Sequence, residues 1–238
     1  MSKKKKIFLW ILIAFVVASL ALAWCFKDTI KVVISGVTET PEQLQEKKEN
    51  LDNKQKEALE QAGINNIRPL DETEKEELDK GNITKEEAIE IITGKATLDD
   101  IKQNKENEQT GQPKQPANES TPVDNSVNEK VAQLIGEIYV LEANFTSQLA
   151  GLEAWAINEY ESVSKAEKPA KKKELAAIGF PKLAALEKEC DGKVNAILSE
   201  LAEVLKSSGQ SVALVDQIRN AYEEKKIVTK SHYISEYM

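Results

Sequence analysis

The stretch VNEKVAQLIGEIYVLEANFTSQLAGLEAW, residues 127–155, decides the fold class of this chain. Its apolar side chains recur at steps of four or three residues, which is the spacing of one face of an α-helix. They are Val127, Val131, Leu134, Ile138, Leu141, Phe145, Leu149, Leu152 and Trp155. A stripe of this kind is buried against other helices. We therefore expect a long helix here, within an all-α fold.

Two further stripes follow with the same spacing. The second runs from Leu175 to Leu205 and stops at Ser207-Ser-Gly209, and the third begins at Val212. Glycine accepts the positive φ that commonly ends a helix. Because three amphipathic helices joined by short turns can cover one another, the sequence predicts an elongated antiparallel three-helix bundle over residues 127–238.

The segment Gly179-Phe180-Pro181 interrupts the second stripe. Proline lacks the N–H that would bond to the carbonyl four residues earlier, and its ring clashes with that carbonyl. We expect the helix to kink or break here, and a bend along the neighbouring helix is favoured over a functional hinge.

Residues 104–126 are predicted to be a disordered linker. They hold three of the seven prolines and almost no apolar side chains, so they cannot bury enough surface to become ordered. Before them, residues 64–103 are predicted to form a small helical mini-domain. Its helix starts carry the spacing of capping boxes, at Asp71 and Glu74, Thr84 and Glu87, and Thr97 and Asp100.

Residues 27–63 are predicted to be a juxtamembrane segment followed by a stalk helix. Thr40 is a suitable N-cap, Pro41 suits a first helical turn, and Gly63 suits the end. Leu44 and Leu51 are seven residues apart, but the other seam position of each heptad is mostly Lys or Gln. The pattern favours a solvated stalk over a dimerising coiled coil, because a coiled coil prefers both seam positions apolar.

The run IFLWILIAFVVASLALAWCF, residues 7–26, contains no charge, proline or glycine. As a helix it is roughly 30 Å long, which matches the hydrocarbon core of a bilayer. Trp10 and Trp24 lie near its two ends, where aromatic rings prefer the headgroup level. Lys3, Lys4, Lys5 and Lys6 precede it. By the positive-inside rule, we expect residues 1–6 to be a cytoplasmic tail and the segment to anchor the chain in the membrane lipid.

Two alternatives to an intact anchor remain open. Ala21-Leu22-Ala23 fits the small-x-small pattern of a signal-peptidase site, so cleavage after Ala23 would release the chain. A lipid on Cys25 is less favoured, because bulky Trp24 stands where a lipoprotein signal has a small residue.

Charge and composition argue against several classes of function. The net charge is −8, and the four amino-terminal lysines leave −12 for residues 27–238. We expect no nucleic-acid binding, since this part of the chain repels phosphates. A single histidine, His232, and two distant cysteines leave most metal and acid–base sites without their usual ligands. No nucleophile elbow or glycine-rich phosphate loop is present, so we expect no catalysis, no metal and no cofactor.

The carboxy-terminal segment contains the stretches LEANFTSQLAGLEAW, LEKECDGKVNAILSEL and LVDQIRNAY. Through these residues it resembles a group of uncharacterised bacterial single-pass envelope proteins. The resemblance implies an amino-terminal anchor in the plasma membrane and a helical ectodomain, with no established activity.

These features predict a membrane-anchored extracytoplasmic scaffold or interaction module of the cell envelope, with a protein partner bound by the helical domain. A regulatory or sensory membrane protein acting through a partner is one alternative. A secreted helical protein, released by signal cleavage, is the other. Association into a homo-oligomer is left open by the sequence.

Overall fold

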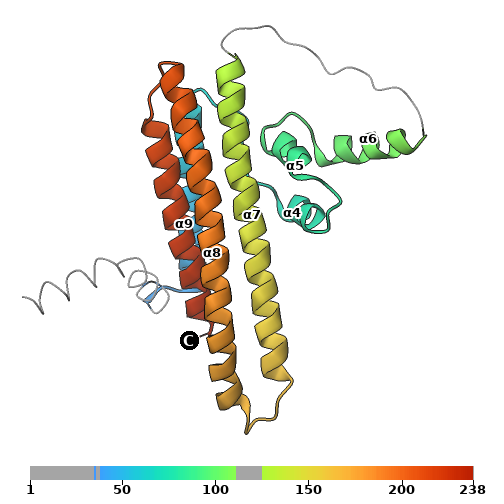
Figure 1. Cartoon of the computed structure of the whole chain (residues 1–238), viewed down its shortest axis with the longest axis vertical. Helices are drawn as coiled ribbons and strands as arrows, with labels where there is room; N and C mark the ends of the chain where they lie inside the picture. The colour runs from blue at the N-terminus through green and yellow to red at the C-terminus, as the bar shows by residue number, and fades with distance from the viewer. Residues whose placement is uncertain (1–34, 36–37, 111–124, 238) are drawn as a thin grey trace, which may run out of the picture. The chain divides into compact units, whose positions relative to one another are not determined.

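The computed structural model describes residues 35, 38–110 and 125–237, which form seven α-helices and no strand (Figure 1). The predicted all-α fold class is confirmed. The helices are α3 (Pro41–Gln61), α4 (Glu72–Asp79), α5 (Lys85–Ile92), α6 (Leu98–Thr110), α7 (Asn125–Glu161), α8 (Lys168–Ser207) and α9 (Ala213–Tyr237).

The chain divides into two compact units. The central unit is residues 58–215 and contains α4 to α8. The terminal unit combines the described residues up to Glu57 with those from Asp216 onward, so it joins most of α3 to most of α9. These units differ from the predicted ranges, which separated residues 64–103 from 127–238. The long helices α7, α8 and α9 are present, while their association as one three-helix bundle stays a prediction.

The helices α7 and α8 form the core of the central unit. They run side by side in opposite directions, joined by the short connection 162–167 (Figure 1). The predicted stripes meet between them: Leu134, Ile138 and Leu201 are fully buried. Full burial of one such side chain contributes about 1.5–3 kcal/mol.

The helix α8 continues through Pro181 without a break. The prediction that the helix could break here is therefore wrong. Proline costs a helix one hydrogen bond, here to the carbonyl of Ala177. Both residues are exposed, so that carbonyl can bond to water. The cost is therefore smaller than it would be in the core.

A second face of α7 is buried by the small helices that precede it in sequence. Ile135, Tyr139 and Val140 are buried in addition to the predicted stripe, and α4 and α5 pack against α7 (Figure 1). A Cβ at Gly136 would lie 3.1 Å from the side chain of Ile89 in α5. Glycine therefore allows the two helices to approach closely, and the predicted mini-domain is part of the same compact unit as α7.

The predicted helix starts are confirmed. In each of the three pairs, the amide of the later residue donates to the side chain of the earlier one, and the earlier amide donates back to the carboxylate. These pairs are Asp71 and Glu74, Thr84 and Glu87, and Thr97 and Asp100. Each box satisfies amides that the first helical turn leaves without partners.

The part of the predicted linker that the structure describes is helical. Residues 104–110 belong to α6, and α7 begins at Asn125. The remainder of the predicted linker, residues 111–124, lies outside the described residues. Residues 104–110 are helical because they continue α6. The Thr97 cap and the buried Ile101 stabilise the first turn of that helix, and the polar residues that follow extend it.

The capping box of α4 is strengthened by an arginine. The Arg68 guanidinium donates two hydrogen bonds of 2.6 Å to the carboxylate of Glu74, which is 4% exposed. The hydrogen bonds from Arg68 lower the pKa of Glu74, and burial opposes them. The pair thus holds a buried carboxylate in its charged form.

We predict that the stability of the central unit falls in acid through this pair. Because the pKa of Glu74 is lower in the folded chain, its contribution is complete above the unfolded value of about 4.3 and is lost as the pH falls through the folded pKa. Glu74→Gln is expected to remove this part of the pH dependence and about 1 kcal/mol at pH 7, since Arg68 is half exposed and screened. Urea unfolding from pH 7 to pH 3 measures the slope, and equal slopes in both proteins would contradict the assignment.

The terminal unit shows that α3 is not a solvated stalk. Leu44 is 1% exposed and forms an apolar cluster with Leu51 and with Val228 of α9. The prediction of a solvated stalk is therefore corrected: most charged residues of α3 are exposed, but one face of the helix is buried. The predicted N-cap is in place, since the amide of Gln43 donates to Thr40.

The polar seam position Gln55, which argued against packing, is buried with a partner. Lys225 of α9 is 6% exposed, and its ammonium donates to Gln55 Oε1 at 2.6 Å and pairs with Asp52 at 2.6 Å. These two oxygens compensate for the cost of burying the ammonium charge of Lys225. The helices therefore pack through a seam that is apolar at one end and polar at the other.

Within the residues that the structure describes, no helix combines the length and apolar composition needed to cross a bilayer. The predicted anchor, residues 7–26, lies outside them.

Candidate functional site

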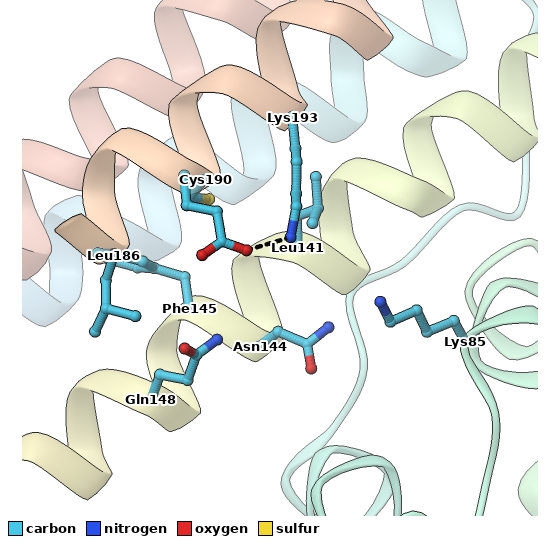
Figure 2. Close-up of a pocket in the computed structure, with 9 residues that line it drawn as sticks. Lys85, Leu141, Asn144, Phe145, Gln148, Leu186, Cys190 and Lys193 are labelled. Atoms are coloured by element: carbon cyan, nitrogen blue, oxygen red, sulfur yellow. Dashed lines mark hydrogen bonds and ion pairs between the residues drawn. The ribbon is translucent and has the colours of Figure 1, made fainter.

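One candidate site is a shallow cavity of about 170 Å³ between α7 and α8, opposite the first residue of α5. Figure 2 shows Asn144 and Gln148 on α7, Lys193 on α8, and Lys85 reaching toward them from α5. The full lining is Lys85, Leu141, Asn144, Phe145, Gln148, Leu186, Glu189, Cys190 and Lys193.

The chemistry of this cavity is that of a helix surface. Its only carboxylate, Glu189, accepts a hydrogen bond of 2.5 Å from Lys193 one turn later, and this bond lowers the pKa of Glu189. A carboxylate with a lowered pKa is a weak base, and it carries no proton that it could donate as a general acid near neutral pH. Cys190 lies within the second stripe, which runs from Leu175 to Leu205, and it is buried. Small-molecule sites are about 300–1,000 Å³, so this cavity is undersized as well.

No metal centre is evident in the described part of the chain. Residues 38–110 and 125–237 contain no group of three or more His, Cys, Asp or Glu side chains that could hold an ion.

The second candidate is the outer face of the first half of α8. Phe180 is 70% exposed, the highest value among the exposed large apolar residues of the described chain. Ala177, Pro181 and Ala184 beside it are also exposed. A fully exposed phenylalanine forgoes about 1.5–3 kcal/mol of burial. An exposed apolar residue flanked by small side chains on a regular helix is the second candidate for an interaction surface.

The sequence explains why this face is left open. Leu175 and Cys190 belong to the second stripe and are buried, whereas Phe180 does not belong to that stripe. Gly179 has nothing within 4 Å of where its Cβ would be. The segment that looked like a fault in the helix is therefore the centre of a second, outward surface.

A basic run precedes this face, and its charge is partly neutralised; it consists of Lys168, Lys171, Lys172 and Lys173. The Lys171 ammonium pairs with Glu159 at 2.8 Å and with Glu174 at 3.1 Å, and the hydrogen bond to Glu159 raises the pKa of Lys171 most. Lys168 pairs with Glu161 at 2.9 Å. These contacts join the ends of α7 and α8, so the run stabilises the turn more than it presents charge.

The residues predicted to form the membrane anchor are not placed by the structure. Lys3, Lys4, Lys5, Lys6, Trp10 and Trp24 all lie outside the described residues. The exposed face of α8 was not among the predicted sites. Its signal was available in the spacing of Ala177, Phe180 and Ala184.

Comparisons with known proteins add no assignment: no family model matches the sequence, and neither curated proteins nor solved structures give a significant match.

Proposed function

We propose that this protein is a membrane-anchored helical interaction module of the cell envelope. Residues 7–26 hold the chain in the plasma membrane, residues 1–6 lie in the cytoplasm, and the helical part lies outside the membrane. The chain recruits a protein through the outer face of α8 and performs no catalysis. The observation that carries this proposal is the exposed Phe180 at the centre of a regular helical face.

The physical properties of the chain support an interaction role. The central unit buries its apolar residues between α7 and α8 and between α7 and α5, so the α8 face is not needed for its core. Ala177 and Ala184 allow a second backbone to come close, and Phe180 supplies a large apolar contact between them. These are the elements of helix-to-helix recognition.

The anchor rests on the sequence alone. An uncharged run of this length is the signature of a membrane span, and Lys3–Lys6 set its orientation. A mature mass lower by residues 1–23 would show cleavage after Ala23 and would turn the anchored module into a secreted one.

The orientation is tested by thiol labelling of intact cells. The chain with Cys25→Ser, Cys190→Ala and Ala185→Cys carries one exposed thiol on α8. We expect a membrane-impermeant maleimide to label it in intact cells, and the protein to stay in the membrane after carbonate extraction. Labelling only after lysis would contradict the proposed orientation.

The interaction surface is tested by placing a photoreactive residue at position 180 or at exposed position 185 in living cells. We expect one discrete protein adduct from position 180 and none from position 185, because only the first lies at the centre of the α8 face. Equal adducts from both positions would indicate random collision and would contradict the proposal.

A further inference from the structure

The α8 face has the spacing of a second helix-packing seam. Six residues follow one another at steps of four, three, four, three and four, which is the alternation of a heptad repeat. We define them as the α8 seam: Lys173, Ala177, Phe180, Ala184, Glu187 and Asp191. The first four are exposed and the last two are half-buried. The stripe that packs on α7 lies on another side of the helix.

We infer that the partner of the α8 seam is a second copy of the same seam, packed antiparallel. The inference rests on the proposed interaction function and names its partner. In an antiparallel pair centred on position 182, each seam residue faces the residue equally far on the other side. Phe180 of one copy then faces Ala184 of the other, and the symmetric contact repeats it. A large side chain meets a small one in both central layers.

The charges of the seam are complementary in the same register. Lys173 faces Asp191 of the second copy at each end of the seam. On the flank of the seam, Glu174 lies beside Lys188 of the second copy. Opposite charges therefore meet at four places around the apolar centre, and such flanking pairs set the register and orientation of helix pairs.

Other arrangements of the seam fit less well. A parallel pair in register places Lys173 against Lys173 and Phe180 against Phe180, so like charges meet and the two large rings coincide. An anionic membrane surface would meet Glu174, Glu187 and Asp191 along with the lysines, and those carboxylates are repelled by its headgroups. Of the three arrangements compared, the antiparallel pair is the one that matches both size and charge.

The seam is short, so the association is expected to be weak. Its six residues span 19 positions of α8, or roughly 28 Å of helix, which is less than the contact of a permanent dimer. Association therefore depends on protein concentration, and crosslinking of the full chain in vesicles is the suitable test.

The register is tested with single cysteines in the full chain carrying Cys25→Ser and Cys190→Ala. One copy carries Phe180→Cys, the other carries Ala184→Cys, and different tags distinguish them. We expect mild oxidation of the mixture to give a mixed disulfide dimer, because these positions face one another. Each variant alone is offset from its own copy by four residues, about 6 Å along the axis, and should give little dimer. Ala185→Cys, exposed on another side of α8, is the matched control and should give none.

The charge pairing is tested by reversal and rescue. Glu174→Lys places two lysines side by side and should abolish the mixed dimer, and the second change Lys188→Glu should restore it. Both side chains are exposed, so neither change disturbs the core. Circular dichroism of each variant checks that the helices remain.

Several outcomes would overturn the inference. Dominant dimers of Phe180→Cys with itself would indicate a parallel pair, and absence of any dimer would exclude a second copy. A fluorophore on Phe180→Cys that reports an apolar environment at every protein-to-lipid ratio would indicate bilayer insertion instead. A photoadduct at position 180 to a different protein, without self-crosslinks, would overturn the second copy while leaving the proposed interaction function standing.

Discussion

Replacing Leu44 with alanine is expected to destabilise the terminal unit by about 2–5 kcal/mol. The side chain is 1% exposed and belongs to the cluster with Leu51 and Val228. Removing three side-chain carbons forfeits their burial and leaves a cavity that the two helices fill only partly. A solvated stalk would lose almost nothing.

The loss is measured by urea unfolding and by hydrogen exchange of α9 amides near Val228. Glu46→Ala is the matched control, because Glu46 is exposed on the same helix and alanine favours helix formation there. We expect α9 protection to fall in Leu44→Ala alone. If both variants unfolded at the same urea concentration, the packing of α3 against α9 would be excluded.

Replacing Gly136 with leucine is expected to cost the central unit about 1–3 kcal/mol through overpacking. Even a Cβ at this position lies 3.1 Å from Ile89, and a leucine adds three further carbons where α5 approaches α7. Because Ile91 and Ile92 of α5 are buried, displacing this helix exposes apolar surface.

Gly151→Leu, in the same helix, provides the control. Nothing lies within 4 Å of a Cβ there, so this substitution should stabilise α7 by up to about 0.8 kcal/mol through helix propensity. The two substitutions are therefore expected to change the free energy of unfolding in opposite directions. Hydrogen exchange should show loss of α5 protection for Gly136→Leu only, and stabilisation by both would contradict the close α5–α7 contact.

Helix identity and helix ends could be predicted from the sequence because they depend on local physics. The Thr84 and Glu87 box forms as expected, since each side chain needs only a residue three positions away. Gly63, Gly81 and Gly209 adopt the positive φ that ends a helix. Such features need no knowledge of distant residues.

Long-range packing was harder to predict because its evidence is divided between distant segments. Gln55 argued against a packed α3, yet its partner Lys225 is 170 residues away. The need for glycine at position 136 comes from Ile89, which is 47 residues away in the sequence and close to it in the fold. A residue that looks wrong for packing can be correct when the opposite helix supplies its complement.

The candidate site was missed for a related reason. Phe180 was interpreted through its neighbours Gly179 and Pro181, as part of a flaw in a buried stripe. The residues of the α8 seam obey a heptad spacing of their own, and the alternation becomes informative only once exposure separates it from the stripe facing α7. Two periodic patterns can share one helix.

The pairing of Lys225 with Gln55 also determines when α3 can pack during synthesis, because its partner helix is made much later. The two residues are 170 positions apart, and synthesis adds about 5–20 residues per second. A nascent chain therefore carries an α3 without its partner for on the order of 10–30 s. Throughout that interval Leu44 and Leu51 have no Val228 to cover them, so the growing chain exposes an apolar pair that becomes buried only after α9 has been made.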